Sequence, residues 1–157
     1  MNDKLDPVRS LLRTQTTLVL ATVGEDGLPR STALFYVTDE SLNLYWFSSR
    51  SSLHSRNCTR NPEASVAIST DARTWQEIKG AQMQGRISLV ADRALRKSIT
   101  ADYVKHFALG NLFSLAIRRS SLYRFTPRWV RYIDNSRRFG YQVEFDLPSC
   151  MPETSTV

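Results

Sequence analysis

Residues 17–48 decide the fold, and they read TLVLATVGEDGLPRSTALFYVTDESLNLYWFS. Three runs of β-branched, aromatic and aliphatic residues are separated here by two short polar turns, which predicts three consecutive strands beginning with a hairpin. The strands are expected at residues 17–23, 30–38 and 42–48, and the turns at residues 24–27 and 39–41. In the third strand, Leu44 and Trp46 fall on one face and Tyr45 and Phe47 on the other. Both faces are therefore apolar, as in a closed or doubly covered sheet.

The rest of the chain adds further short strands and a few helices. Strands are expected at residues 64–69, 78–90, 122–126, 129–134 and 141–147, and helices at residues 5–14, at residues 51–60 and after Asp92. In the last of these helices, Leu95, Ile99, Tyr103 and Phe107 recur every four residues and indicate a face packed on the core. Many short strands with turns favour a mainly β fold, a barrel with two or three short helices. Residues 1–147 are expected to form this single domain, and residues 148–157 a disordered tail.

Two features inside the strands suggest local irregularity. Gly80 and Gly85 interrupt the run at residues 78–90, and glycine inside a strand often marks a bulge or a close backbone approach. We therefore expect Gly85 to tolerate no large side chain. Pro127 is expected to separate two strands, because proline cannot donate to a central ladder.

Bulk properties exclude several classes of protein. The chain has 157 residues, a net charge of +6 and 41% hydrophobic residues, which fits one globular domain. No stretch approaches the roughly 18 apolar residues of a membrane span, and the N-terminal residues are charged where a signal peptide is apolar. A cytoplasmic location is expected. Cys58 and Cys150 are expected to stay reduced there, and with His54 and His106 they show no metal-ligand spacing.

Arginine dominates the positive charge, with 17 Arg against 4 Lys. Seven of these arginines lie in residues 117–140 beside a single acid, Asp134. A guanidinium binds phosphate or carboxylate at two points, so this segment is either a solvated sheet face or a surface for an anionic ligand or partner. Nucleic acid is the least favoured partner, because the chain has no recognition helix and its aromatic residues are not interleaved with basic ones.

Residues 46–62, WFSSRSSLHSRNCTRNP, carry the strongest signal for a binding site. A strand ends in a turn rich in serine and arginine, and a helix begins there. The free amides and positive dipole end of a helix N-terminus attract anions. Arg50 adds a guanidinium, and His54 and Arg56 follow within the first helical turns. Because Ser52 also suits a plain helix cap, the turn is either a phosphate site or a capped helix start.

Several segments resemble the FMN-binding split barrels of the pyridoxamine 5'-phosphate oxidase-like family. They are LATVGEDGLPRSTALFYV (20–37), LYWFSSRSSLHSRN (44–57) and RNP (60–62). Two later segments, IKGAQMQGRI (78–87) and RYIDNSRRFG (131–140), are similar to an uncharacterised subgroup of that family. The resemblance covers most of residues 8–146 and implies a split β-barrel of the FMN-binding type.

The resemblance also implies an FMN site, with the flavin carrying oxidoreductase chemistry. The cofactor-binding residues that it implies are Arg30, Ser31, Thr32, Phe47, Ser48, Ser49, Arg50, Ser52, His54, Arg56 and Gln82. Many members have lysine where His54 stands, and a neutral imidazole is a weaker phosphate donor, so weaker FMN binding is expected. The C-terminal arginine-histidine motif of true pyridoxamine phosphate oxidases is not evident, so that reaction is not predicted, and no catalytic residue is assigned.

Two other functions stay open at this point. In one, the fold has lost its cofactor and residues 117–140 bind an anionic ligand or partner. In the other, the same fold binds haem or a deazaflavin. The colour of the purified protein separates them, because flavin is yellow, haem is red-brown and a cofactor-free module is colourless.

Strands that are apolar on both faces predict a homodimer, because the outer face needs a cover. The aromatic candidates for that outer surface are Tyr36, Tyr45, Phe47, Trp129 and Tyr132. Trp75 and Phe139, like Trp129 and Tyr132, are interpreted as core or interface residues in preference to a platform for a flavin ring. Asp134 and Asn135, near Phe139 and Gly140, are interpreted as a structural turn.

Overall fold

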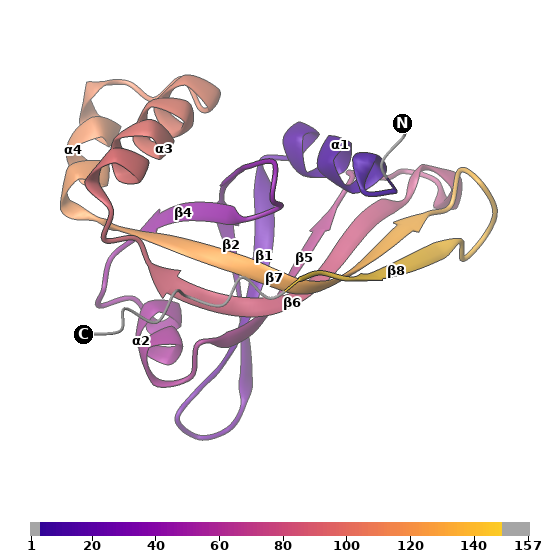
Figure 1. The fold of residues 1–157 in the computed structure, drawn as a ribbon, viewed down its shortest axis with the longest axis horizontal. Coiled ribbons are helices and arrows are strands. Elements are labelled where there is room, and N and C mark those ends of the chain that lie inside the picture. Colours follow the sequence, from indigo (N-terminus) through magenta and orange to yellow (C-terminus); the bar gives the residue numbers. More distant parts are fainter. Residues whose placement is uncertain (1–3, 149–157) are drawn as a thin grey trace.

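One curled antiparallel sheet dominates the computed structural model (Figure 1). The structure describes residues 4–148, without the side chains of residues 111–114. Within that part of the chain, eight strands pair in the order β2-β1-β5-β6-β7-β4-β3, with β8 beside β7. The strands are β1 (Thr17–Val23), β2 (Pro29–Phe35), β3 (Val37–Thr38), β4 (Leu44–Ser48), β5 (Glu63–Ser69), β6 (Lys79–Leu89), β7 (Ser121–Asp134) and β8 (Gln142–Asp146). The helices are α1 (Asp6–Thr14), α2 (Leu53–Arg60), the 3-10 turn η1 (Trp75–Glu77), α3 (Arg93–His106) and α4 (Asn111–Arg119).

The sheet is a barrel that stays open along one seam. The ends of the strand order, β2 and β3, are joined through Tyr36 but share no ladder in the described part of the chain. β7 pairs with β6 along most of its length, with β4 through its first half and with β8 through its second half. The predicted mainly β split barrel is confirmed.

β1 and β2 form the predicted hairpin, in which Thr17 pairs with Phe35. Its turn closes where the Gly27 N–H donates to the Gly24 carbonyl at 3.0 Å. Gly27 has φ +76°, in the region that favours glycine. The acidic-glycine turn is therefore a local property that the sequence alone specifies.

The core fills the barrel interior, and a helix closes each end (Figure 1). Inward side chains from five strands are buried together, among them Leu18, Leu20, Leu44, Trp46, Val66, Met83, Phe125 and Val130. α1 covers one end, where the Tyr36 hydroxyl donates to the Leu12 carbonyl at 2.7 Å. α2 packs on β1 at the other end, where the buried Asn57 amide donates to the Thr22 hydroxyl at 3.0 Å. These two buried bonds fix both helices on the barrel.

The two strands predicted on either side of Pro127 are a single strand, β7, so the predicted break is wrong. A register shift between Gln84 and Gly85 places Gly85 opposite Pro127. Proline is tolerated at such a bulge, because the ladder is already interrupted there. A Cβ atom on Gly85 would lie 2.2 Å from the Thr126 carbonyl oxygen and 2.8 Å from the Pro127 Cα. The close approach predicted at Gly85 is confirmed.

Two short elements were not predicted, η1 and α4. α4 begins after Gly110, which offers no side-chain cap, so the usual start signal is missing from the sequence. α3, by contrast, begins at the predicted cap, where the Asp92 carboxylate accepts from the Leu95 N–H at 2.7 Å. Its apolar stripe is confirmed, since Ile99 and Tyr103 are buried.

Three aromatic residues expected on the surface between two copies are inside one chain instead. Tyr36, Tyr45 and Tyr132 are 1%, 2% and 6% exposed. Each hydroxyl has an internal acceptor, and a buried tyrosine needs such a partner. The Tyr45 hydroxyl donates to the Asp39 carboxylate at 2.9 Å, and the Tyr132 hydroxyl lies 3.4 Å from the Asp134 carboxylate.

Cys58 is buried, and burial raises the pKa of its thiol to about 11. Cys150 and the predicted tail from residue 149 onward lie outside the described residues. Between residues 4 and 148, no helix is long and apolar enough to cross a membrane.

Candidate functional site

The serine-rich turn between β4 and α2 is organised by its own hydroxyls. Ser52 is the N-cap of α2, and its Oγ accepts from the Ser55 N–H at 3.3 Å. The Ser49 Oγ accepts from the Ser51 N–H at 3.2 Å and lies 2.8 Å from the Ser51 Oγ. Ser52 therefore acts as the helix cap that the sequence suggested. The start of α2 lies beside Ser48, the last residue of β4.

His54 turns back from α2 toward this turn. Its Nε2 lies 2.6 Å from the Ser48 Oγ and 3.1 Å from the Ser52 Oγ. The ring is half-buried, and burial lowers the pKa of His54, so the imidazole is neutral at pH 7. A neutral ring that already bonds two hydroxyls is a polar partner for a ligand but not a fixed positive charge.

Arg50 supplies the positive charge at the turn itself. Its Nε donates to the Ser121 hydroxyl at 3.0 Å, which ties the turn to the first residue of β7. The side chain is exposed, so the rest of its guanidinium fork faces solvent. Arg50, the hydroxyls of Ser48 and Ser49 and the start of α2 form a set of donors that suits a phosphate group.

Arg30 and Arg56 lie in a second pocket, on the other flank of α2. This cavity of about 500 Å³ lies between the β1–β2 turn and α2, and its lining includes Leu53, Asn57 and Arg60. Two hydrogen bonds of 2.8 and 2.7 Å join the Arg30 guanidinium to the Asp26 carboxylate. The bond from Arg30 is the main reason that the pKa of Asp26 falls to about 2. Asp26 therefore neutralises Arg30 at any physiological pH. Among the described residues, Arg30 forms its hydrogen bonds with the β1–β2 turn and none with residues 48–52.

The remaining predicted site residues lie on strands. Ser31 on β2 and Gln82 on β6 are exposed on the outer face of the sheet, whereas Thr32 alternates to the half-buried inner face. The Gln82 amide oxygen lies 3.5 Å from the Arg131 guanidinium. Phe47, on β4, is half-buried beneath the Arg96 guanidinium, 5.3 Å from the ring centre. The predicted residues thus divide into a turn cluster, a pocket beside α2 and separate positions on β2, β4 and β6.

α3 bridges the two edges of the barrel seam, a feature that the sequence did not reveal. The Tyr103 hydroxyl donates to the Phe35 carbonyl on β2 at 3.1 Å. The Tyr103 ring also meets Phe47 on β4 edge-on at 5.2 Å, and Phe107 packs 4.8 Å from Phe35. The regular apolar stripe was the available signal, but spacing cannot tell a bridge across a seam from ordinary core packing.

A further cavity, of about 560 Å³, lies between α1, β3 and the end of α3. Its lining combines apolar Leu12 and Tyr36 with the cationic side chains of Arg13 and Lys105. His106, which is exposed, stands at the same cavity. Sequence reasoning missed this site, because its residues come from segments almost 100 positions apart.

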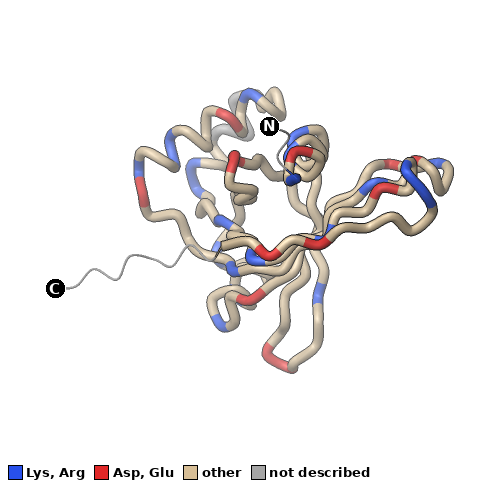
Figure 2. Tube along the Cα trace, turned by 45° about the vertical axis from the view of Figure 1, so that its right-hand side comes forward, with Lys and Arg blue, Asp and Glu red and all other residues tan. Residues whose placement is uncertain are grey.

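The arginines of residues 117–140 do not form one patch. They spread from the end of α4 along β7 to the turn before β8, and acidic residues lie among them (Figure 2). Several are ion-paired: Arg128 with Glu63, Arg131 with Glu144, and Arg137 with Asp134.

The aromatic residues considered as a flavin platform are also dispersed. Trp75 and Phe139 are 47% and 76% exposed and pack edge-on 5.5 Å apart, so neither belongs to the core. The Asn135 amide donates to the Trp75 carbonyl at 3.0 Å and accepts from the Gly140 N–H at 3.1 Å. These bonds agree with the structural turn predicted at Asp134 and Asn135.

Known proteins share this architecture. The chain is 26% identical to a UPF0306 protein of Yersinia pseudotuberculosis over 112 residues, which are 71% of this chain and 72% of that relative. A heme binding protein from Mycobacterium smegmatis has a TM-score of 0.76 at 16% identity, over 93% of this chain and 59% of that one. A protein related to general stress protein 26, of the pyridoxinephosphate oxidase family, from Clostridium acetobutylicum has a TM-score of 0.67 at 17% identity, over 93% and 96% of the two chains.

The family model for pyridoxamine 5'-phosphate oxidase matches residues 5–134. That match runs from α1 to the end of β7, and so includes the barrel seam, the turn at Ser48 and Ser52, and α2. With this match, and with a sheet that is open between β2 and β3, the chain belongs to the pyridoxamine 5'-phosphate oxidase family.

Proposed function

We propose that this protein binds FMN, with the phosphate at the turn of residues 48–52, and acts as a flavin-dependent oxidoreductase. The observation that carries the proposal is the donor set at this turn, where Arg50 and the serine hydroxyls meet the start of α2. The family match supports it, since the turn lies within the matched residues. When bound, the flavin would supply the redox chemistry, and the chain's residues would hold and orient it.

His54 is central to how firmly the phosphate would be held. Its Nε2 already engages Ser48 and Ser52, so a phosphate would have to share or displace these bonds. A neutral imidazole also contributes no full charge, and a charge-assisted hydrogen bond is worth about 1.5–3 kcal/mol. We therefore expect His54→Lys to tighten FMN binding about 10- to 100-fold, and protonation of His54 at lower pH to act in the same direction.

The experiment is a titration of the full chain with FMN and with riboflavin, followed by quenching of flavin fluorescence. Wild type should prefer FMN, because riboflavin lacks the phosphate. Arg50→Ala should remove most of that preference by weakening FMN binding about tenfold or more. Arg73→Ala is the matched control, an exposed arginine near η1 on another part of the surface. Equal FMN affinity in wild type, Arg50→Ala and His54→Lys would contradict a phosphate site at this turn.

Haem is the second candidate, and the cavity between α1 and α3 favours it. His106 offers an imidazole at a cavity of about 560 Å³, and Lys105 could pair there with a porphyrin carboxylate. Arg13 would have to share its ion pair with Glu40 to hold a second carboxylate, and Asp102 adds a negative charge to the lining. One similar structure is a heme binding protein, which supports the comparison. Titration with haemin should then give a shifted, intense absorption band that His106→Ala removes and His54→Gln leaves intact.

We also propose that two copies associate through the outer face of β1 and β2. Val19, Val23 and Phe35 are 42%, 39% and 55% exposed on this face. These side chains are spread along the length of the β1–β2 ladder, and exposed apolar groups on one sheet face are typical of interaction sites. Sedimentation of wild type should give a dimer at micromolar concentration, and Val19→Asp should shift it toward monomer. A wild-type monomer under these conditions would contradict the proposal.

A further inference from the structure

Asp134 is the last residue of β7 and lines a cavity together with α1, whereas the turn at residues 48–52 lies beside Ser121, the first residue of the same strand. Its side chain is only 7% exposed. One carboxylate oxygen, Oδ1, is fully used, because it accepts from the Ser136 N–H at 3.1 Å and from the Ser136 hydroxyl at 2.6 Å. This oxygen holds the turn between β7 and β8 and explains the structural role of the residue.

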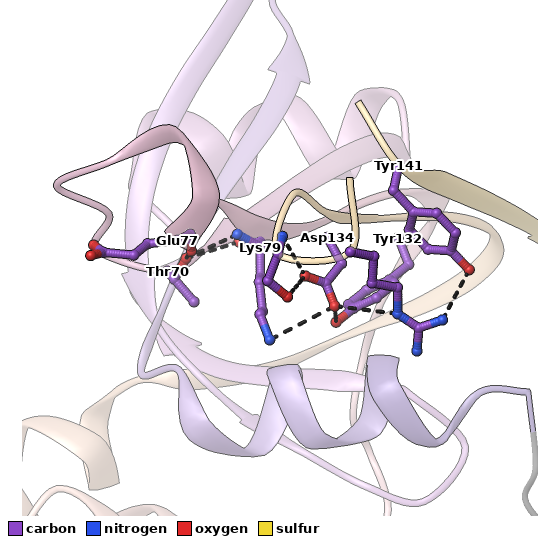
Figure 3. Close-up of polar contacts among 8 residues, drawn as sticks. Thr70, Glu77, Lys79, Tyr132, Asp134 and Tyr141 are labelled. Atoms are coloured by element: carbon purple, nitrogen blue, oxygen red, sulfur yellow. Dashed lines mark hydrogen bonds and ion pairs between the residues drawn. The ribbon is translucent and has the colours of Figure 1, made fainter. Parts of the chain in front are cut away.

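The second carboxylate oxygen, Oδ2, faces a different set of groups. The Tyr132 hydroxyl lies 3.4 Å away, the Lys79 Nζ 3.7 Å away and the Arg137 Nε 3.7 Å away (Figure 3). Both cations are beyond normal hydrogen-bond distance from Oδ2, so each is an ion-pair partner. The Nη1 of Arg137 donates to the Tyr141 hydroxyl at 3.2 Å, and its remaining N–H groups and the Lys79 ammonium keep donor capacity for another acceptor. Lys79 and Arg137 are 41% and 54% exposed at their side chains, which leaves them accessible.

A cavity of about 390 Å³ lies between this cluster and α1. Its floor includes Lys79, Tyr132, Asp134 and Arg137, and its helical wall includes Ser10, Leu11 and Thr14. One concave site therefore collects several donors and one acceptor. They come from two strands, a turn and a helix, and small-ligand sites usually have this form.

The charges select the kind of ligand. Two cations surround one carboxylate, which leaves one excess positive charge at the cavity. Burial raises the pKa of Asp134, but the bonds from Ser136 and the charge of Lys79 outweigh it and lower the pKa overall. Oδ2 therefore remains an anionic acceptor. A fully ionised oxyanion such as sulfate meets repulsion there, whereas an oxyanion that keeps a proton can donate it to Oδ2.

We propose that this cavity binds an inorganic phosphate ion, which keeps at least one proton at pH 7. Two phosphoryl oxygens would accept from Lys79 and Arg137, and the P–OH group would donate to Oδ2 of Asp134. Charge-assisted bonds of this kind are the strong ones in phosphate recognition. The proposal does not depend on flavin, because none of these residues belongs to the turn that would hold FMN.

Isothermal titration of the full chain with inorganic phosphate and with sulfate, at pH 7 and equal ionic strength, tests the proposal. Wild type should bind phosphate at least tenfold more tightly than sulfate. Lys79→Gln should weaken phosphate binding about tenfold or more, because one charge-assisted bond is lost. Lys97→Gln, an exposed lysine on α3, should leave it unchanged. Phenyl phosphate, whose second pKa of about 6 leaves it mostly fully ionised at pH 7, should bind as weakly as sulfate, and tight binding of it would contradict a P–OH donor to Asp134.

Asp134→Asn tests the selectivity directly. An amide can donate where the carboxylate only accepts, so this variant should gain sulfate binding and lose the preference for phosphate. If the variant does not fold, Tyr132→Phe and Lys79→Gln still test the site by affinity. Equal binding of sulfate and phosphate by wild type would overturn the proposal. So would phosphate binding that Arg50→Ala removes and Lys79→Gln leaves intact, since the ion would then sit at the turn before α2.

Discussion

Gly85→Ser should destabilise the barrel more than a substitution at any exposed position of β6, and more than the same substitution at Gly80, the other glycine of this strand. The bulge at Gly85 brings β7 so close that a Cβ would lie 2.2 Å from the Thr126 carbonyl oxygen and 2.9 Å from the Phe125 ring. Backbone atoms on a central strand cannot withdraw as a flexible side chain can. Overpacking in a well-packed core costs about 1–3 kcal/mol, and this overlap lies at or above the upper end. A loss of about 3 kcal/mol lowers Tm by roughly 6–12 °C in a domain of this size.

Urea and thermal unfolding, followed by circular dichroism, measure the change. Gly110→Ser is the matched control, because a Cβ there meets no atom within 4 Å and serine is a good cap for α4. The control should unfold within about 0.5 kcal/mol of wild type. If Gly85→Ser were as stable as Gly110→Ser, the reading of Gly85 as the point of closest approach between β6 and β7 would be wrong.

Three further changes probe the ends of the barrel. Tyr36→Phe should cost about 1–3 kcal/mol in urea unfolding, because it leaves the Leu12 carbonyl without its buried donor. Burial lowers the pKa of His54, so the unfolded chain takes up the proton first and stability falls as pH drops from 7 to 5.5. His54→Gln should reduce this loss of stability at low pH. Parallel stability–pH profiles for wild type and His54→Gln would contradict the assignment to His54. A double-mutant cycle of Asn57→Ala and Thr22→Val should give a coupling of about 0.5–3 kcal/mol, and strict additivity would mean that their bond contributes nothing.

Local sequence patterns predicted the position of many of the strands, turns and helix starts of this fold. The β1–β2 hairpin follows from alternating apolar residues and a glycine with φ +76°, both properties of adjacent positions. The start of α3 follows from Asp92, whose carboxylate bonds an amide three residues on. The donor types at the turn before α2 were equally readable, because hydroxyls, a guanidinium and a helix start lie within a few residues. Such features depend on short-range chemistry, which the sequence carries by itself.

Only the tertiary structure decided what each of these groups bonds to. Arg30 was expected at the phosphate, yet Asp26 neutralises it. His54 was expected to face a ligand, and its ring is already engaged by Ser48. Pro127 was expected to end a strand, but it lies at a bulge opposite Gly85, where the ladder is already interrupted and the strand continues. A side chain's partner depends on what the folded sheet brings within about 3 Å from distant positions. The sequence therefore determined which chemical groups were present, and the packing of the strands determined which of them were left for a ligand.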